Sequence, residues 1–149
     1  MSSESGFRGS TTYVTPTSLE STPLALRVTA LQKTVSHDFV PTAFTGSSIT
    51  AAQLYKAVAL SPTSVGSSYT ATTATAAALV AYDAAAAVGK GYQLSIIDRD
   101  GSNGITVAGG TGVTIVGSTA ISAGKSAQFY LYYTNVTASS EAVTLYRLN

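Results

Sequence analysis

The sequence predicts an all-β domain, an antiparallel jelly-roll-like sandwich with one alanine-rich helix. Two features of about the last sixty residues indicate this fold. Short apolar runs there repeat with a period of two, and glycine-rich turns separate them at intervals of about eight to twelve residues. The length of 149 residues fits a single domain with an additional segment.

The composition limits the kinds of partner. Charged residues make up 10% of the chain and the net charge is +1, whereas a soluble domain carries about a quarter of its residues as charges. The Lys and Arg residues are spread thinly, so we expect no nucleic-acid partner. With no cysteine, the chain has neither disulfides nor thiolate metal sites. This low charge content predicts that much of the domain's surface contacts other protein subunits.

Residues 1–25 are rich in Ser, Thr, Gly and Pro and cannot bury enough apolar area to fold alone. We interpret them as an extended N-terminal arm laid against a partner, with a floppy tail as the alternative, and we place the β-sandwich at residues 26–149. The candidate contact residues of the arm are its isolated apolar side chains, Phe7, Tyr13, Val14 and Leu19.

The first elements of the sandwich are short. Alternating apolar residues predict a strand over 26–31, and a run over 39–44 predicts an edge strand or a bend because Pro41 lacks a backbone N–H. Thr50 is expected to cap a helical turn over 51–55.

Two more strands and the helix follow. The apolar run 57–60 and the Thr- and Tyr-rich run 67–73 predict strands. From Thr75 to Val88 the alanine content favours the only substantial helix, with Gly89 at its C-terminal end. Its small side chains allow close packing against its own sheet, or, as the alternative, against other helices around an oligomer axis.

Beyond Gly91 the apolar residues recur with a period of two within five short runs, which predicts five strands whose apolar residues share one face. The predicted inward-facing residues are Tyr92, Leu94 and Ile96; Ile105 and Val107; Val113 and Ile115; Phe129, Leu131 and Tyr133; and Val143 and Leu145.

Two turns resemble ligand-binding loops. Residues 98–104 place oxygen ligands at alternate positions like a calcium loop, but Asn103 replaces the required glycine and Gly109 replaces the closing glutamate. Residues 123–126 end like a phosphate-binding loop, but Thr119 stands where that motif needs glycine. We therefore expect hairpin turns at both places, with no metal and no cofactor.

The sequence does not predict an enzyme. His37 lies beside Asp38, but no serine has the Gly-x-Ser-x-Gly context of an activated nucleophile, and the carboxylates form no convincing acid–base pair. We assign no catalytic residue. The apolar tract over 76–88 contains Asp83 and is shorter than the roughly 20 residues that span a bilayer, so we expect no membrane association.

Tyrosine is the exception in this composition. Tyr130, Tyr132 and Tyr133 lie in one predicted strand, with Tyr130 and Tyr132 on the face opposite Phe129 and Leu131. Adjacent tyrosines indicate a contact surface with another subunit or, as the alternative, a platform on which sugars stack. We favour subunit contact because little charge surrounds them.

Residues 49–149 resemble the β-domain modules of tailed-phage and large double-stranded DNA virus structural proteins. The resemblance rests on the helix sequence TAAALVA, on YQLSIID, and on the paired runs GITV and GVTI, and it covers about two-thirds of the chain. It implies a capsid decoration, cement or fibre module, commonly a homotrimer, at the capsid surface of a virion. Its partners would be copies of itself and the major capsid protein or other virion proteins, reached through the N-terminal arm. The alternative is a receptor- or carbohydrate-binding fibre tip.

Overall fold

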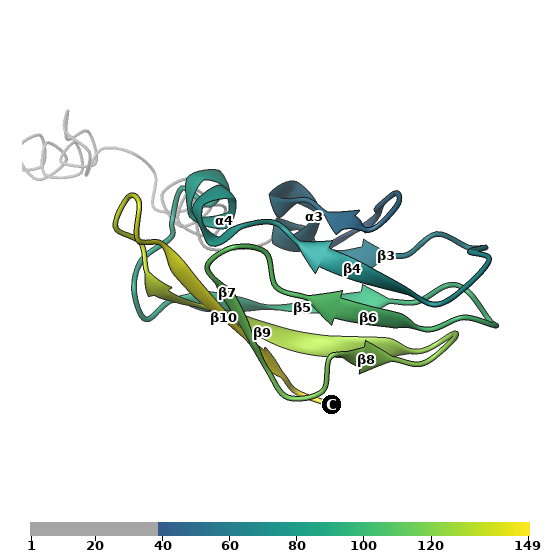
Figure 1. Ribbon diagram of the computed structural model, residues 1–149. Helices are drawn as coiled ribbons and strands as arrows, with labels where there is room; N and C mark the ends of the chain where they lie inside the picture. Colours follow the sequence, from purple (N-terminus) through teal and green to yellow (C-terminus); the bar gives the residue numbers. More distant parts are fainter. Residues whose placement is uncertain (1–38) are drawn as a thin grey trace, which may run out of the picture. The chain divides into compact units, whose positions relative to one another are not determined.

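The computed structural model describes residues 39–149, and they form two β-sheets and two helices (Figure 1). The expected arm of residues 1–25, the expected strand over 26–31 and the His37–Asp38 pair lie outside this range. The predicted β-rich fold is confirmed.

The elements are as follows. The 6-stranded sheet runs in the order β1 (Val40–Ala43), β3 (Ala57–Leu60), β5 (Gly91–Ile97), β9 (Ser126–Asn135), β10 (Ala142–Arg147) and β7 (Val113–Val116). The 4-stranded sheet runs in the order β2 (Ser48–Ile49), β4 (Tyr69–Thr73), β6 (Ile105–Ala108) and β8 (Ala120–Ile121). The helices are α3 (Ala51–Tyr55) and α4 (Ala76–Tyr82).

The prediction that the strands pair antiparallel is wrong, because both sheets are mixed. From β1 to β9, consecutive strands alternate between the two sheets, and the connections can be followed in Figure 1. The pairing is parallel among β1, β3 and β5 and among β2, β4 and β6. It is antiparallel between β5 and β9 and between β6 and β8. Within the described residues, β9 and β10 are the neighbours in sequence that pair as an antiparallel hairpin.

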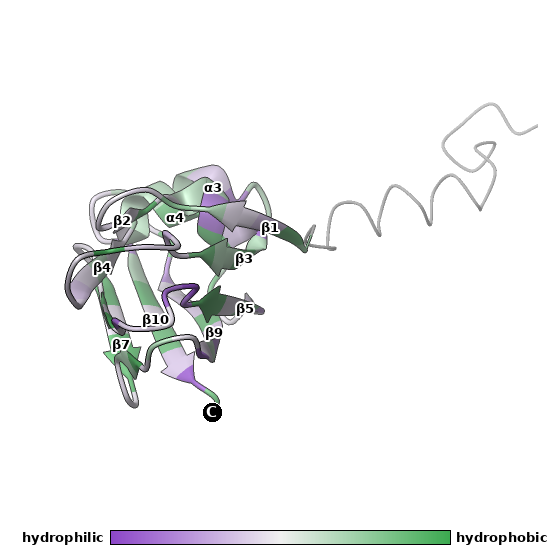
Figure 2. Cartoon of the chain, turned by 90° about the vertical axis from the view of Figure 1, so that its right-hand side faces the viewer, coloured by the Kyte–Doolittle hydropathy of each residue, from purple (hydrophilic) through white to green (hydrophobic). Residues whose placement is uncertain are grey.

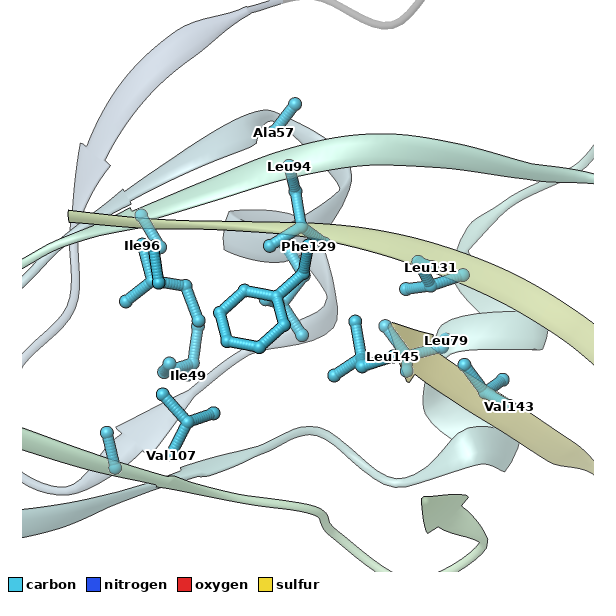
Figure 3. Packing of buried hydrophobic residues seen from close by; sticks show 14 of the residues in the cluster. Ile49, Ala57, Leu79, Leu94, Ile96, Val107, Phe129, Leu131, Val143 and Leu145 are labelled. Atoms are coloured by element: carbon cyan, nitrogen blue, oxygen red, sulfur yellow. The ribbon is translucent and has the colours of Figure 1, made fainter. Parts of the chain in front are cut away.

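The core lies between the sheets and takes every second residue of the central strands. In β9, exposed and buried positions alternate along most of the strand. Phe129, Leu94 and Ile96 of the 6-stranded sheet face Ile49 and Val107 of the other sheet (Figure 3). Burying each side chain of this size contributes about 1.5–3 kcal/mol, so this shared core holds the two sheets together.

Both helices begin at a threonine cap, and the sequence predicts the one at Thr50. The Thr50 hydroxyl accepts a hydrogen bond from the Gln53 amide, and the Gln53 side chain accepts one from the Thr50 amide at 2.8 Å. The Thr75 hydroxyl caps α4 by accepting a hydrogen bond from the Ala78 amide at 3.2 Å. The helix predicted to end at Val88 stops at Tyr82, because the next residue, Asp83, leaves the helical conformation and turns its carboxylate into the interior.

Helix α4 packs within its own domain, and its contact with the core is limited. Ala76 and Leu79 are buried, with Leu79 close to Val143 and Leu145 (Figure 3). The alanines at 77, 78 and 81 are exposed, so close packing uses one face of the helix.

Candidate functional site

The outer face of the 6-stranded sheet is the candidate site. Because side chains alternate across a strand, the residues between the buried positions point away from the core. The strand register arranges them in rows of four. The rows are Ala43, Leu60, Ile97 and Ser126; Pro41, Val58, Ser95 and Gln128; Gln93, Tyr130, Tyr146 and Val116; and Gly91, Tyr132, Thr144 and Thr114. We call this surface the tyrosine face.

No charged residue lies on the tyrosine face. Tyr130, Tyr146 and Val116 are 36%, 41% and 46% exposed, so large apolar groups meet solvent there. The charged side chains of residues 39–149 lie instead in the interior, in loops or at strand ends. Those outside the interior are Lys56, Lys90, Arg99, Lys125, Glu141 and Arg147. In Figure 2 the most hydrophilic colour is likewise found largely in loops, in part of α3 and near the C-terminus, while the strands are mostly pale or green.

The polar groups of the tyrosine face are hydroxyls and amides. The rings of Tyr132 and Tyr146 meet edge to face with their centroids 6.4 Å apart. The side-chain amide of Gln93 donates to that of Gln128 at 3.3 Å, across the boundary between β5 and β9. Each of these groups both donates and accepts hydrogen bonds, so the surface can meet a partner without burying an unpaired charge.

Tyr133, predicted as a third contact tyrosine, is not on this surface. Its side chain is 1% exposed, and its hydroxyl donates to Asp83 Oδ2 at 2.9 Å. Burial raises the pKa of the Tyr133 hydroxyl, and the neighbouring Tyr92 and Asp83 add to the shift. Tyr133 follows the alternation of Phe129 and Leu131, so within the domain its role is structural.

The structure adds a tyrosine that sequence reasoning missed. Tyr146 stands directly opposite Tyr130 in the β9–β10 pairing. The alternation of Val143 and Leu145 already indicates that Tyr146 points to the outer face, but only the register shows that it continues the same surface. The other predicted contact residues, Phe7, Tyr13, Val14 and Leu19, lie outside the described residues.

The loop over residues 98–104 is a crossing between sheets and not the expected hairpin turn, since it joins β5 to β6. Asp100 accepts hydrogen bonds from the amides of Val65 and Ser102 at 2.9 and 2.8 Å, and these bonds lower the pKa of its carboxyl. Asp98 Oδ1 accepts from the Ser61 hydroxyl and the Asp100 amide, both at 3.0 Å. The two carboxylates therefore hold this loop to the crossing between β3 and β4.

The segment over residues 123–126 is also a crossing and not a hairpin, because it joins β8 to β9. Gly124 has a positive φ of 66°, which a tight turn needs. Among residues 39–149, no three His, Cys, Asp or Glu side chains are grouped as metal ligands would be. Within the same residues, no helix is long and apolar enough to cross a bilayer.

Protein-family models, curated proteins and solved structures were all compared with this chain, and none matches it.

Proposed function

We propose that this chain is a structural protein of a virus particle, a capsid decoration or cement protein that works by assembly and not by catalysis. The observation that carries the proposal is the tyrosine face, a broad exposed surface with aromatic side chains and no charge. Surfaces of this kind on soluble proteins are contact surfaces, and the centres of protein interfaces are enriched in tyrosine and depleted of charge.

In this proposal the domain forms a homo-oligomer, the arm of residues 1–25 reaches neighbouring capsid subunits, and the protein lies at the capsid surface. Phe7, Tyr13, Val14 and Leu19 would be the arm's contact residues. Several arms on one oligomer would bind together more tightly than one arm alone. Of the jelly-roll-like fold, the proposal uses only the packing of two sheets against each other. The strands do not all pair antiparallel, as they would in an antiparallel sandwich.

The test uses particles of the virus that encodes the chain, stripped of this protein. The full chain and a variant lacking residues 2–20 are mixed with the particles and sedimented. We expect the full chain to co-sediment at saturation and the shortened chain to remain in solution while keeping its β-sheet circular dichroism spectrum. Failure of the full chain to bind would refute the particle role. Full occupancy by the shortened chain would refute the arm.

A second candidate is a receptor- or carbohydrate-binding tip. It is favoured because tyrosine rings and the Gln93 and Gln128 amides lie on the same face, since aromatic faces stack on sugars while amides bond to hydroxyls. A glycan array probed with the full chain separates the candidates. Specific binding that is lost in a Tyr146→Ala variant supports the tip, and a blank array supports the assembly protein.

A further inference from the structure

We infer that the tyrosine face pairs with the same face of a second copy of this chain, around a two-fold axis. The inference rests on the self-association in the proposed function and names its surface and symmetry. A two-fold interface places each residue opposite its own equivalents, so the surface must be complementary to itself.

The chemistry of the tyrosine face meets this requirement. A charge near a two-fold axis would face an identical charge, and the strand register places none on this face. The tyrosine, serine and threonine hydroxyls and the glutamine amides each act as donor and acceptor. A copy of the same face can therefore offer a donor or an acceptor to each of these groups, whereas a partner of one charge sign would find no opposite charge on this face.

The size of the face is sufficient for a stable pair. Strands lie about 4.8 Å apart and outward residues recur about every 6.6 Å along a strand, so each outward residue covers about 32 Å² of flat area. The rows of four together cover about 500 Å² of flat area per copy. The relief of the tyrosine side chains adds to this, so two faces bury more than about 1,000 Å², the size that a specific interface needs.

The distribution of charged and uncharged side chains also resembles that of a protein–protein interface. Gln93, Ser95, Gln128 and Tyr130 occupy the centre of the face, on the paired strands β5 and β9. Lys90 and Lys125, each just before one of these strands, lie beyond its ends. An uncharged centre with charges outside it is the common pattern of protein–protein contacts.

The outer face of the 4-stranded sheet provides a comparison. Its outward residues are small and include no aromatic side chain. They are Ser48, Thr70, Thr72, Thr106, Ala108 and Ala120. Fewer strands and smaller side chains give this face less area to bury, so it serves as the control surface.

The experiment places opposite charges at the centre of the tyrosine face in the full chain. Gln93 is exposed, so Gln93→Lys and Gln93→Glu should both fold. We expect native mass spectrometry to give an even number of copies for the unaltered chain, and each variant alone to associate at least tenfold more weakly. An equimolar mixture of the two variants should regain association, because opposite charges then meet across the axis. Gln128→Lys and Gln128→Glu repeat the test on β9, and Thr106→Lys is the control expected to change nothing.

The outcomes separate the inference from the proposed function. Trimers whose mass and affinity are insensitive to Gln93 and Gln128 would overturn the two-fold pairing and leave an assembling protein. A monomer at every concentration would overturn the pairing and the self-association in the proposed function. Weakening in each variant without recovery in the mixture would also overturn the two-fold pairing, because it places the residue in an interface between unlike surfaces.

Discussion

Replacing Tyr133 with phenylalanine is expected to destabilise the domain through the carboxylate that it leaves behind. The Tyr133 hydroxyl donates to Asp83 Oδ2 at 2.9 Å, and Asp83 is 5% exposed. The other carboxylate oxygen already accepts from the Ala85 amide at 2.9 Å. Water therefore has little access to replace the lost hydroxyl, and the buried Asp83 carboxylate loses one of its hydrogen bonds.

The magnitude follows from the kind of hydrogen bond. Phenylalanine preserves the buried ring, so no apolar contact is lost, and the change removes one hydrogen bond to a charged group. Bonds of this kind contribute about 1.5–3 kcal/mol, and we expect a loss of about 2 kcal/mol. In a chain of 149 residues this corresponds to a melting temperature lower by about 6 °C.

Urea denaturation followed by circular dichroism measures this loss as a change in the free energy of unfolding. Tyr82→Phe is the matched control, because it removes the same atom from a side chain that is 49% exposed. An Asp83→Asn change combined with Tyr133→Phe completes a double-mutant cycle, and the coupling between the two positions should exceed about 1 kcal/mol. A Tyr133→Phe variant within about 0.5 kcal/mol of the unaltered chain would refute the structural role given to this pair.

Three further predictions concern pH and chain packing. Burial raises the pKa of Tyr92 and of Tyr133, so above pH 10 the unfolded state releases protons that the folded state keeps. The urea concentration at the unfolding midpoint should therefore fall from pH 10 upward, and it should fall less steeply in the Tyr133→Phe variant. Backbone amides lower the pKa of Asp100, so its contribution to stability should be present at neutral pH and lost on acidification below about pH 4. When the urea midpoint is measured as a function of pH, the Asp100→Asn variant should show a smaller fall below about pH 4. A Cβ at Gly91 would lie 1.9 Å from a β9 carbonyl oxygen, so Gly91→Ala should cost about 3 kcal/mol in urea denaturation, whereas Gly101→Ala, with nothing within 4 Å of its Cβ, should be tolerated.

The positions of most described elements can be predicted from the sequence because they depend on neighbouring residues. The alternation of Tyr92, Leu94 and Ile96 gives both the strand and its buried face, and the structure buries all three. Thr50 marks the start of α3 because its cap needs only the amide of Gln53. Pro41 marks an edge strand because the missing N–H is harmless there, and β1 lies at the edge of its sheet.

The features that could not be predicted from the sequence depend on contacts between residues far apart in the chain. The alanines after Asp83 favour a longer helix, but the partner that holds the Asp83 carboxylate is Tyr133, fifty residues later in the chain. Glycine and asparagine at 98–104 show that the chain turns, and the same turn chemistry serves a hairpin or a crossing between sheets. Pattern alone therefore gives the strands without their order.

The candidate site shows the same division. The alternation within β9 places Tyr130 and Tyr132 on one face, whereas their neighbours Gln93 and Tyr146 come from two other strands and are known only through the register. The low charge content is a property of the whole sequence. Whether it leaves an uncharged surface depends on where the fold places the few charged residues.

The strand order decides that placement. Because consecutive strands from β1 to β9 alternate between sheets, each of those connections crosses from one sheet to the other at a strand end. Such crossings require polar residues, and these lie at the strand ends together with Lys90, Arg99 and Lys125. The outward positions between those ends are then left to uncharged residues over a continuous area. The alternating strand order and the low charge content together leave a broad uncharged face, and an exposed face of this kind is typical of protein contact surfaces.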